Sequence, residues 1–493
     1  QQTESLIERS ENQCFELEDY PVLTAILQNY FTLDWAMEEK SQSIKRLLKL
    51  IFGSRSEKSK DVLEDKENPP EPNENAERKE KAKGHGRRAA SEYKGAQRVG
   101  VSHESFQVGD PCPLCPKGKL YPLSLPGVVV RVVGRAPLDA TVYELERLRC
   151  NLCGEVFTAQ APKEAGEKKY DETAGAMVAL LKYGTGFPFH RLETLQEDLG
   201  VPFSASTQWD VVAERAEQIE PVYQELNRQA AQGDIIHNDD TIMKILEGIE
   251  HADPSRKGTF TTGILSVKGD LKIALFFTGT HHAGENMDKV LRNRESGLSP
   301  PIQMCDALSQ NVPKEFQTIL ANCLTHGRRN FVELVSSFPE KCRYVIETLG
   351  EVYQNDHIAK EQNLSFQERL TFHQHKSAPL MEQLHAWLED QLNEKKVEPN
   401  SSMGKAIKYM LRHWEPLTLF LRMPGAPLDN YLCERALKKA ILHRKNAYFF
   451  KTQRGAEVGD LFMSLIHTCS LNRINPFDYL VALHENASDL AKH

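Results

Sequence analysis

Apolar runs separated by polar turns in the middle of the chain predict a β-sheet with interspersed helices. The stretch DIIHNDD (234–240) has the pattern of a strand, and GTFTTGILSV and LKIALFFTGT surround the turn KGD as a β-hairpin. AGENMDKVLRNR has helical spacing, PPIQMCDALSQN is a short strand that ends on Asp306, and TILANCLTHGRRNFVELV is a strand that passes into a helix. The predicted order is therefore β-β-β-α-β-α-β-α.

Helical patterns precede this segment. Residues 170–232 predict short helices that are broken at Gly184 and Gly200, with Ser204 and Ser206 as N-caps. Such helices form either a helix-turn-helix or a plain helical bundle, and the sequence does not separate the two.

A second helical region follows the predicted sheet. Residues 338–425 are rich in Glu, Gln, Lys and Leu and are predicted to be mostly helical. After them, LDNYLCERALKKAILHRKN predicts a helix that carries Glu434 and starts near Asp429 or Asn430, either of which can cap it.

Four of the ten cysteines form two C-x-x-C pairs, and these are Cys112 with Cys115 and Cys150 with Cys153. Each pair can place two thiolates on one tetrahedral metal, and two such knuckles that close a β-hairpin make a zinc ribbon with a structural Zn²⁺. The segments VVVRVVG and TVYELERLRC between the pairs have the pattern of strands. A redox dithiol, the alternative, needs only one pair, and a site of four thiolates leaves no open position for catalysis.

Size and charge narrow the class of protein. The 493 residues suffice for two to four domains, and 40% hydrophobic with 26% charged residues is ordinary for a globular protein. We expect no membrane span, because no apolar run reaches about 18 residues. The N-terminal QQTESLIERSENQ is too polar for a signal peptide, so we expect a cytoplasmic location. The net charge of −8 argues against simple coating of nucleic acid unless the basic residues are clustered.

Three acidic residues fit the order of a ribonuclease H-like nuclease core: Asp239 on the first strand, Asp306 at the end of the fourth, and Glu434 on the late helix. Phosphodiester cleavage needs an activated nucleophilic oxygen and a stabilised leaving oxygen, and two divalent ions about 3.5–4 Å apart provide both. Mg²⁺ prefers hard oxygen ligands such as carboxylates. We expect Asp239 to bridge two Mg²⁺ ions, and Asp306 and Glu434 to hold one each.

Basic residues cluster after Glu434 and beside the core. Lys438 lies one helical turn beyond the acid and Lys445 about two turns further, so DNA at the metals would lie against this stretch. A solvated helix face is the alternative. His326 with Cys323 is either a polar brace within the core, which we favour, or a lone metal pair. The candidate DNA-binding residues are Arg328, Arg329, Arg435, Lys438, Arg444 and Lys445.

Several motifs, in order and from residue 42 to the end, resemble the insertion sequence 66 transposase family of bacterial mobile elements. FGSRSEK resembles its N-terminal signature, CPLC with CNLC its zinc-binding module, and KYGTGFPFHRLE its helical segment before the core. HNDDT resembles the first catalytic block, and CLTHGRRNF resembles a Cys-aromatic-x-His block with an Arg pair. PLDNYLCERALKKAILHRKNAYFF and INPFDYLVAL resemble the terminal catalytic block and the C-terminal tail.

The resemblance implies a DDE transposase, an enzyme that nicks transposon ends by metal-assisted hydrolysis and directs the exposed 3′-hydroxyl at target DNA. It implies a triad of Asp239, Asp306 and Glu434 with Mg²⁺, or Mn²⁺ as a substitute. The expected partners are transposon-end and target DNA, a second copy of the chain on DNA, and small accessory proteins. Asp240 stands where the family usually has Glu, which makes Asp240 a rival for Asp239.

The predicted fold is multidomain α/β: a ribonuclease H-like catalytic core with the helical insertion that the resemblance implies, preceded by a zinc ribbon and helical DNA-binding segments. A non-catalytic DNA-binding regulator derived from a transposase and a nuclease for RNA hybrids are the alternative functions. The predicted ranges are an N-terminal helical region 1–60, a basic and acidic linker 61–103, the zinc ribbon 104–160, a helix-turn-helix-like domain 165–232, the first part of the core 233–337, the insertion 338–400, the second part of the core 401–455 and a C-terminal helical tail 456–493.

Overall fold

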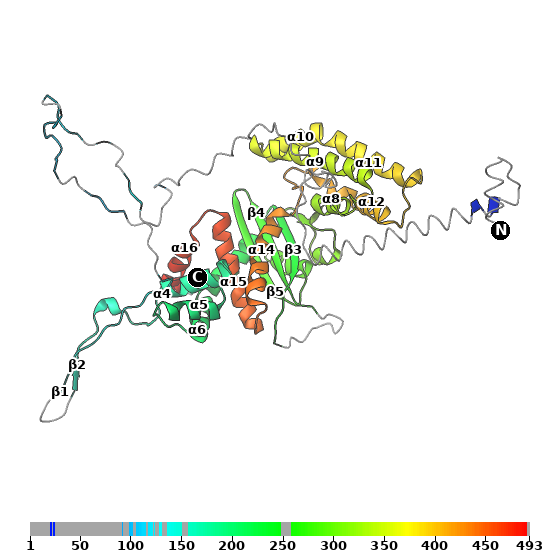
Figure 1. The fold of residues 1–493 in the computed structure, drawn as a ribbon. Helices are drawn as coiled ribbons and strands as arrows, with labels where there is room; N and C mark the ends of the chain where they lie inside the picture. The colour runs from blue at the N-terminus through cyan, green and yellow to red at the C-terminus, as the bar shows by residue number, and fades with distance from the viewer. Residues whose placement is uncertain are drawn as a thin grey trace, which may run out of the picture. The chain divides into compact units, whose positions relative to one another are not determined.

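The computed structural model describes most of the chain from residue 156 onward and shorter stretches before it (Figure 1). The chain divides into two compact units, residues 65–137 and residues 1–64 with 138–493. Nearly all of the predicted N-terminal helical region and linker lies outside the described residues. The described residues are 20–21, 23–24, 91, 98–101, 105–114, 117–121, 123, 128–130, 136–149, 156–247 and 258–490.

A five-stranded mixed sheet is the central element of the larger unit. Strands β3 (Ile235–Ile242), β4 (Phe260–Lys268) and β5 (Leu271–Gly279) follow one another and pair antiparallel. Strands β6 (Ile302–Cys305) and β7 (Ile319–Asn322) run parallel to β3. The spatial order is β5-β4-β3-β6-β7, so β3, the first of these five strands along the chain, is central, and its carboxyl end lies beside the carboxyl end of β6.

The five predicted strands are confirmed, but one predicted connection is wrong. Helix α7 (Ala283–Leu291) joins β5 to β6 and helix α8 (Leu324–Val332) follows β7, both as expected. Between β6 and β7 the predicted helix is only a 3-10 turn, Ser309–Asn311. The next residue, Val312, is extended, because the proline at 313 disfavours a helical conformation of the residue before it.

Helices cover both faces of the sheet. Alternate side chains of a strand point to opposite sides, and the strands carry apolar side chains on both sides. On one face, Leu265 of β4 shares a buried core with α14 (Tyr431–Ala447) and α15 (Gln453–Leu471). On the other face, Ile264 packs in a core with Met287 of α7. Each fully buried side chain of this size stabilises the fold by about 1.5–3 kcal/mol, so both layers hold the strands in place.

Gly263 allows α14 to lie close against β4. A Cβ at this position would lie 3.0 Å from the side chain of Leu437 and 3.4 Å from Cys433 Sγ. The Cys433 thiol donates a hydrogen bond to the Gly263 carbonyl over 3.2 Å. Because Gly263 pairs with Asp239 across the two strands, this contact sets the helix that carries Glu434 beside Asp239.

The chain between β7 and α14 is mostly helical, which confirms the prediction for residues 338–425. After α8 come α9 (Pro339–Glu361), α10 (Phe366–Lys376), α11 (Ala378–Asn393) and α12 (Ser402–Arg412). A short helix α13 (Trp414–Leu417) and a 3-10 turn precede α14. Helices α8 to α12 lie together in Figure 1. Side chains of α8, α9, α11, α12 and α13 form a second apolar core with side chains of β6 and β7.

The helices before the sheet share a core with the C-terminal helices. Ser204 is the N-cap of its helix and accepts a hydrogen bond from the Thr207 amide over 3.3 Å, which confirms one predicted cap, whereas Ser206 lies inside the helix. Side chains of this segment and of the C-terminal helices belong to one buried cluster. The elements are α4 (Glu172–Ala179), a π-helical turn Leu180–Gly184, α5 (Phe189–Asp198), α6 (Ala205–Ala230), α16 (Pro476–Glu485) and α17 (Ala487–Leu490). No helix in the described part of the chain is both long and apolar enough to cross a membrane.

The strands predicted between the C-x-x-C pairs are largely absent from the described residues there. Strand β1 (Arg147–Arg149) covers only the end of TVYELERLRC and pairs antiparallel with β2 (Val156–Thr158). Residues 128–130, the described part of VVVRVVG, form no strand. Val129 is 95% exposed, and a strand needs a partner for its backbone groups.

Each C-x-x-C pair is nevertheless flanked by short antiparallel pairing. Arg149 of β1 lies opposite Val156 of β2 on either side of the CNLC motif. In the other unit, Pro111 forms an antiparallel bridge with Lys119, and the Cys112 amide donates to the Gly118 carbonyl over 2.8 Å. Of the four cysteines, Cys112 alone is among the described residues, so the predicted zinc ribbon lies mostly outside them.

Candidate active site

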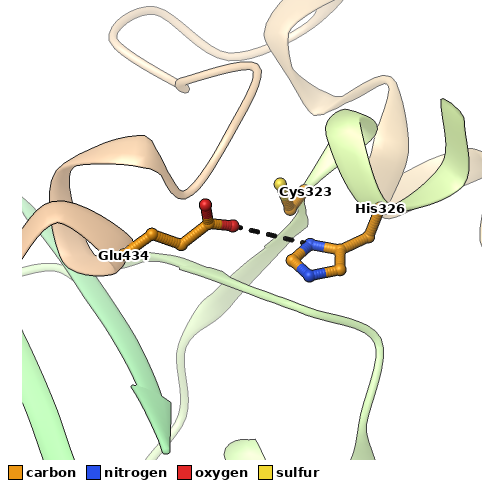
Figure 2. A group of neighbouring side chains, drawn as sticks. All are labelled: Cys323, His326 and Glu434. Carbon is orange, nitrogen blue, oxygen red and sulfur yellow. Dashed lines mark ion pairs between the residues drawn. The ribbon is translucent and has the colours of Figure 1, made fainter. Parts of the chain in front are cut away.

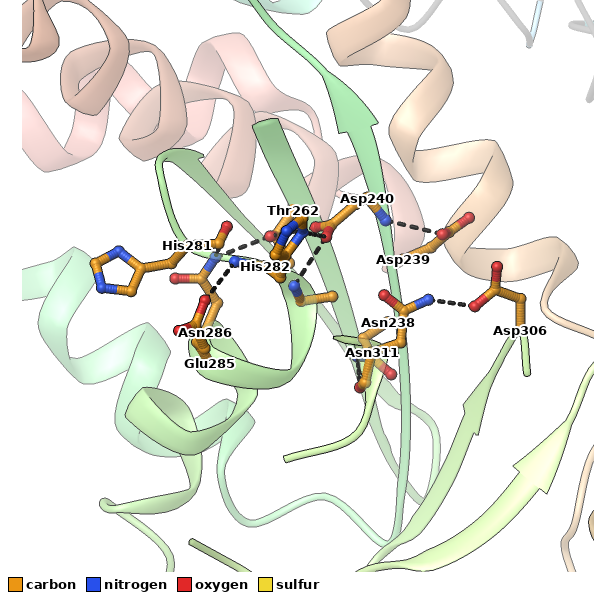
Figure 3. Close-up of polar contacts among 11 residues, drawn as sticks. Asn238, Asp239, Asp240, Thr262, His281, His282, Glu285, Asn286, Asp306 and Asn311 are labelled. Carbon is orange, nitrogen blue, oxygen red and sulfur yellow. Dashed lines mark hydrogen bonds and ion pairs between the residues drawn. The ribbon is translucent and has the colours of Figure 1, made fainter. Parts of the chain in front are cut away.

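Parallel pairing of β3 with β6 brings Asp239 and Asp306 to the same edge of the sheet. His237 lies opposite Met304 in this pairing, and two residues further along the register sets Asp306 opposite Asp239. Both side chains lie at this edge in Figure 3. The sequence placed both acids at strand ends, and the parallel register makes them neighbours.

Asp240, the rival for Asp239, points away from Asp306. Its carboxylate accepts hydrogen bonds from Thr262 Oγ1 over 2.6 Å and from the Ala283 amide over 2.9 Å, and it lies 3.1 Å from His282 Nδ1 (Figure 3). Because adjacent residues of a strand face opposite sides, only one of the two aspartates can face Asp306. Asp240 therefore anchors the start of α7, and Asp239 is the member of the pair that lies with the other acids.

Asn430 joins the start of α14 to β3 and so positions Glu434. Its side chain is fully buried, its Oδ1 lies 3.1 Å from His237 Nδ1, and its Nδ2 donates to the Asn238 carbonyl over 3.1 Å. Of the two predicted caps, Asn430 is at the N-cap position, but its side chain binds β3 instead of the helix. Glu434 follows one turn later, and its backbone amide donates to the Asn430 carbonyl over 3.0 Å.

The environment of Asp239 disfavours its charged form. Burial raises the pKa of Asp239 to about 7. The Asp240 amide, which donates to Asp239 Oδ1 over 2.8 Å, opposes this rise, whereas the charges of Asp306, Asp240 and Glu434 add to it. Asp239 thus loses its proton at a higher pH than an exposed aspartate does, unless a positive charge is supplied nearby.

A buried side-chain amide and a backbone amide support the carboxylate of Asp306. Asn311, which is 1% exposed, donates from its side chain to Asp306 Oδ1, and the Leu308 amide donates to the same oxygen over 3.2 Å. The Asn311 carbonyl accepts from Asn238 and from Gln303, each over 2.7 Å. Sequence analysis missed Asn311, whose only signal was its place in the SQN turn after Asp306.

Glu434 also faces His326, which was predicted as a supporting residue, with a metal pair with Cys323 as the alternative. His326 Nδ1 lies 3.9 Å from Glu434 Oε1, and Cys323 lies beside them (Figure 2). One ligand atom from each of Cys323, His326 and Glu434 lies within 4.8 Å of the others. No other such group of three occurs among the described residues.

The distances among the carboxylates of the three acids limit how they could bind a metal ion. Asp239, Asp306 and Glu434 do not form a group within the 4.8 Å limit that Cys323, His326 and Glu434 satisfy. Oxygen ligands lie about 2.0–2.1 Å from Mg²⁺, so these three carboxylates could not all bind one ion without moving.

The predicted DNA-binding residues differ in exposure. Arg435, Lys438 and Lys445 are exposed along α14. Arg444 is partly buried and donates to Thr241 Oγ1 over 3.2 Å and to the Ile242 carbonyl, so it braces the end of β3. The remaining two belong to α8, where Arg329 is half-buried and Arg328 is 8% exposed.

Replacing Asn430 by Ala is expected to lower the free energy of unfolding by about 1–3 kcal/mol, because it leaves His237 Nδ1 and the Asn238 carbonyl buried without their partner. Urea denaturation measures this change. Asn400→Ala, at an exposed position, is the control and is expected to change stability by less than about 0.5 kcal/mol. Equal stability of the two variants would contradict the role assigned to Asn430.

Comparison with known proteins places the chain in a family. It is 26% identical over 358 residues to the uncharacterized protein y4hP of Sinorhizobium fredii (strain NBRC 101917 / NGR234), covering 70% of this chain and 64% of the relative. It is 36% identical over 168 residues to the uncharacterized protein y4jD of the same strain, covering 34% of this chain and 32% of the relative. The chain thus spans less than two thirds of either relative.

A family model described as Transposase IS66 family matches residues 168–458. This range is more than half of the chain and contains the whole sheet, α14 and the three acids at its edge. The chain therefore belongs to the IS66 transposase family.

Proposed function

We propose that this chain is a DDE transposase, which cleaves DNA at transposon ends and transfers the resulting 3′-hydroxyl to target DNA. Asp239, Asp306 and Glu434 are its proposed catalytic residues. The observation that carries the proposal is that these acids, far apart in the sequence, are close enough at one sheet edge for their charges to act on Asp239. Membership of the IS66 transposase family supports the same reaction.

The sheet supports a ribonuclease H-like core for this reaction. Three antiparallel strands are followed by two strands parallel to the first, and the central strand carries Asp239. On this proposal the first part of the core ends with α8, and helices α9 to α11 are the insertion (338–400). The second part of the core, 401–455, begins with α12 and returns to the sheet with Glu434 on α14.

The donor set fits Mg²⁺, with Mn²⁺ as a substitute. Three carboxylates offer the hard oxygen ligands that Mg²⁺ prefers. Burial raises the pKa of Asp239, and the negative charges of the other acids add to the rise. When bound, Mg²⁺ supplies activation of the attacking oxygen and stabilisation of the leaving oxygen. The chain contributes rigid placement, with Asp306 held by Asn311 and Glu434 by the anchored start of α14.

The exposed basic residues of α14, Arg435, Lys438 and Lys445, are proposed to contact the phosphate backbone of DNA that reaches the acids. Arg329 is proposed to assist from α8. Arg328 and Arg444, which the sequence analysis also predicted as DNA ligands, are more enclosed. For them we propose that any DNA contact is secondary to holding the core.

Two further features belong to the proposal. Cys112, Cys115, Cys150 and Cys153 are proposed to hold one structural Zn²⁺, which the two C-x-x-C pairs in the sequence support. Since transposition joins two ends, at least a homodimer is proposed on DNA, and small accessory proteins are candidate partners.

The test is cleavage of labelled element-end DNA by the full chain in the presence of Mg²⁺. Wild-type protein is expected to nick the end and join it to target DNA, and Asp239→Asn is expected to bind the same DNA without nicking it. Asp234→Asn, at the exposed opposite end of the same strand region, is the matched control and should cleave normally. Binding without cleavage by wild type and all variants would favour a non-catalytic regulator instead.

A further inference from the structure

Three potential metal ligands of different chemistry converge beside the acids. Cys323 directly follows β7 and is the N-cap of α8, and His326 lies three residues later in the first turn of that helix. Residues three apart on a helix share one side. Glu434 reaches them from α14, and its carboxylate faces the His326 ring with the Cys323 sulfur alongside (Figure 2).

The polar atoms of this group have few partners within the protein. His326 Nδ1 is buried and has no hydrogen-bond partner, and its 3.9 Å separation from Glu434 Oε1 exceeds a hydrogen bond. Leaving such a nitrogen unsatisfied costs about 1–3 kcal/mol. The Cys323 sulfur is fixed in place, because it accepts a hydrogen bond from the Asn430 amide over 3.3 Å. The group therefore offers potential metal ligands from fixed positions, and one of them is a ring nitrogen without a hydrogen bond.

We propose that Cys323, His326 and Glu434 form a binding site for a thiophilic divalent cation such as Zn²⁺. Zn²⁺ is bound tetrahedrally by Cys sulfur at about 2.3 Å and by His nitrogen or carboxylate oxygen at about 2.0–2.2 Å, so its ligand atoms lie about 3.3–3.7 Å apart. The ligand atoms of this group lie within 4.8 Å of one another, so the side chains would close by about 1 Å when the ion binds. Mg²⁺ is a poor match, because it prefers oxygen over sulfur and nitrogen.

The position of Glu434 gives this site a consequence for catalysis. A Zn²⁺ ion held by Glu434 with Cys323 and His326 would occupy a carboxylate that the proposed function assigns to Mg²⁺. Zn²⁺ is therefore expected to inhibit DNA cleavage in competition with Mg²⁺, and Cys323→Ser should weaken that inhibition. This consequence rests on the proposed function, whereas the binding of Zn²⁺ does not.

The binding test uses the full chain without DNA or Mg²⁺, dialysed against buffered Zn²⁺, with bound zinc measured by elemental analysis. Wild-type protein is expected to hold one more zinc per chain than Cys323→Ser or His326→Gln, with affinity at this site reduced at least about 100-fold in each variant. Cys342→Ser removes a buried thiol on α9 and is the matched control, with zinc content equal to wild type. With Co²⁺ in place of Zn²⁺, Cys323→Ser should lose part of the sulfur-to-metal absorption.

Glu434→Gln keeps the inference testable if the buried variants fail to fold, because the Glu434 side chain is 32% exposed and its loss should not disturb packing. This variant is expected to bind zinc more weakly and also to lose cleavage. Unchanged zinc binding in folded Glu434→Gln, Cys323→Ser or His326→Gln would overturn the inference. If Glu434→Gln loses cleavage but binds zinc as wild type does, the proposed function is supported and the zinc site is not. If it binds zinc more weakly but cleaves DNA normally, the zinc site is supported and the catalytic role of Glu434 is not.

Discussion

Asp306→Asn is expected to reduce DNA cleavage by at least about 1,000-fold while DNA binding persists. The amide has nearly the same shape and can still accept hydrogen bonds from Asn311 and the Leu308 amide, so the loop should keep its conformation. It lacks the negative charge that a Mg²⁺ ligand supplies. Metal ions contribute several kcal/mol of transition-state stabilisation, and each 1.4 kcal/mol is a factor of about ten in rate.

Single-turnover nicking of labelled end DNA measures the rate, and a gel-shift titration measures binding. Asp270→Asn, in the exposed turn of the β4–β5 hairpin, is the matched control and should match wild type in both assays. Cleavage by Asp306→Asn within about tenfold of the wild-type rate would remove Asp306 from the site. A parallel loss of DNA binding would point to a misplaced loop.

Hydrophobic periodicity was sufficient to predict the strands of the sheet and the helix of Glu434. It could not separate Asp239 from Asp240, because IIHNDD has no apolar–polar alternation that marks one face. Pairing with β4 and β6 resolves this, since Asp239 shares a cross-strand pair with Gly263 and Asp240 faces α7. The side of the sheet that each aspartate faces is thus determined by how β3 pairs with its neighbouring strands.

The contacts that hold the acids were invisible in the sequence for a similar reason. Asn430 and His237 are far apart along the chain, and neither has a local signal that predicts their hydrogen bond. Arg444 was predicted to contact DNA from its charge alone, yet its guanidinium binds the end of β3. The helix expected between β6 and β7 does not form, because a proline disfavours a helical conformation of the residue before it, and Val312 is extended.

Mg²⁺ is expected to stabilise the folded chain more at pH 8 than at pH 6. Burial raises the pKa of Asp239 to about 7, so the folded state holds this proton more tightly than the unfolded state. The associated stability is fully present below about pH 4 and is lost progressively as pH rises to about 7. Since each pKa unit corresponds to about 1.4 kcal/mol, the charged carboxylate costs at most about 4 kcal/mol at pH 8 without a cation. A bound Mg²⁺ offsets that cost. At pH 6 more of the Asp239 carboxyl is protonated, so the cost of the buried charge is smaller and Mg²⁺ stabilises the fold less.

Thermal unfolding with EDTA and with Mg²⁺, at both pH values, measures the effect as a shift in midpoint of several degrees. Asp239→Asn should raise the midpoint at pH 8 in EDTA and should remove most of the response to Mg²⁺. Asp460→Asn separates charge burial from metal binding, because burial also raises the pKa of Asp460 to about 7 while its carboxylate accepts hydrogen bonds from Thr278, away from the acids. That variant should lessen the pH dependence and keep the Mg²⁺ response. An equal Mg²⁺ response at pH 6 and pH 8 in wild type would mean that the cation does not act through Asp239.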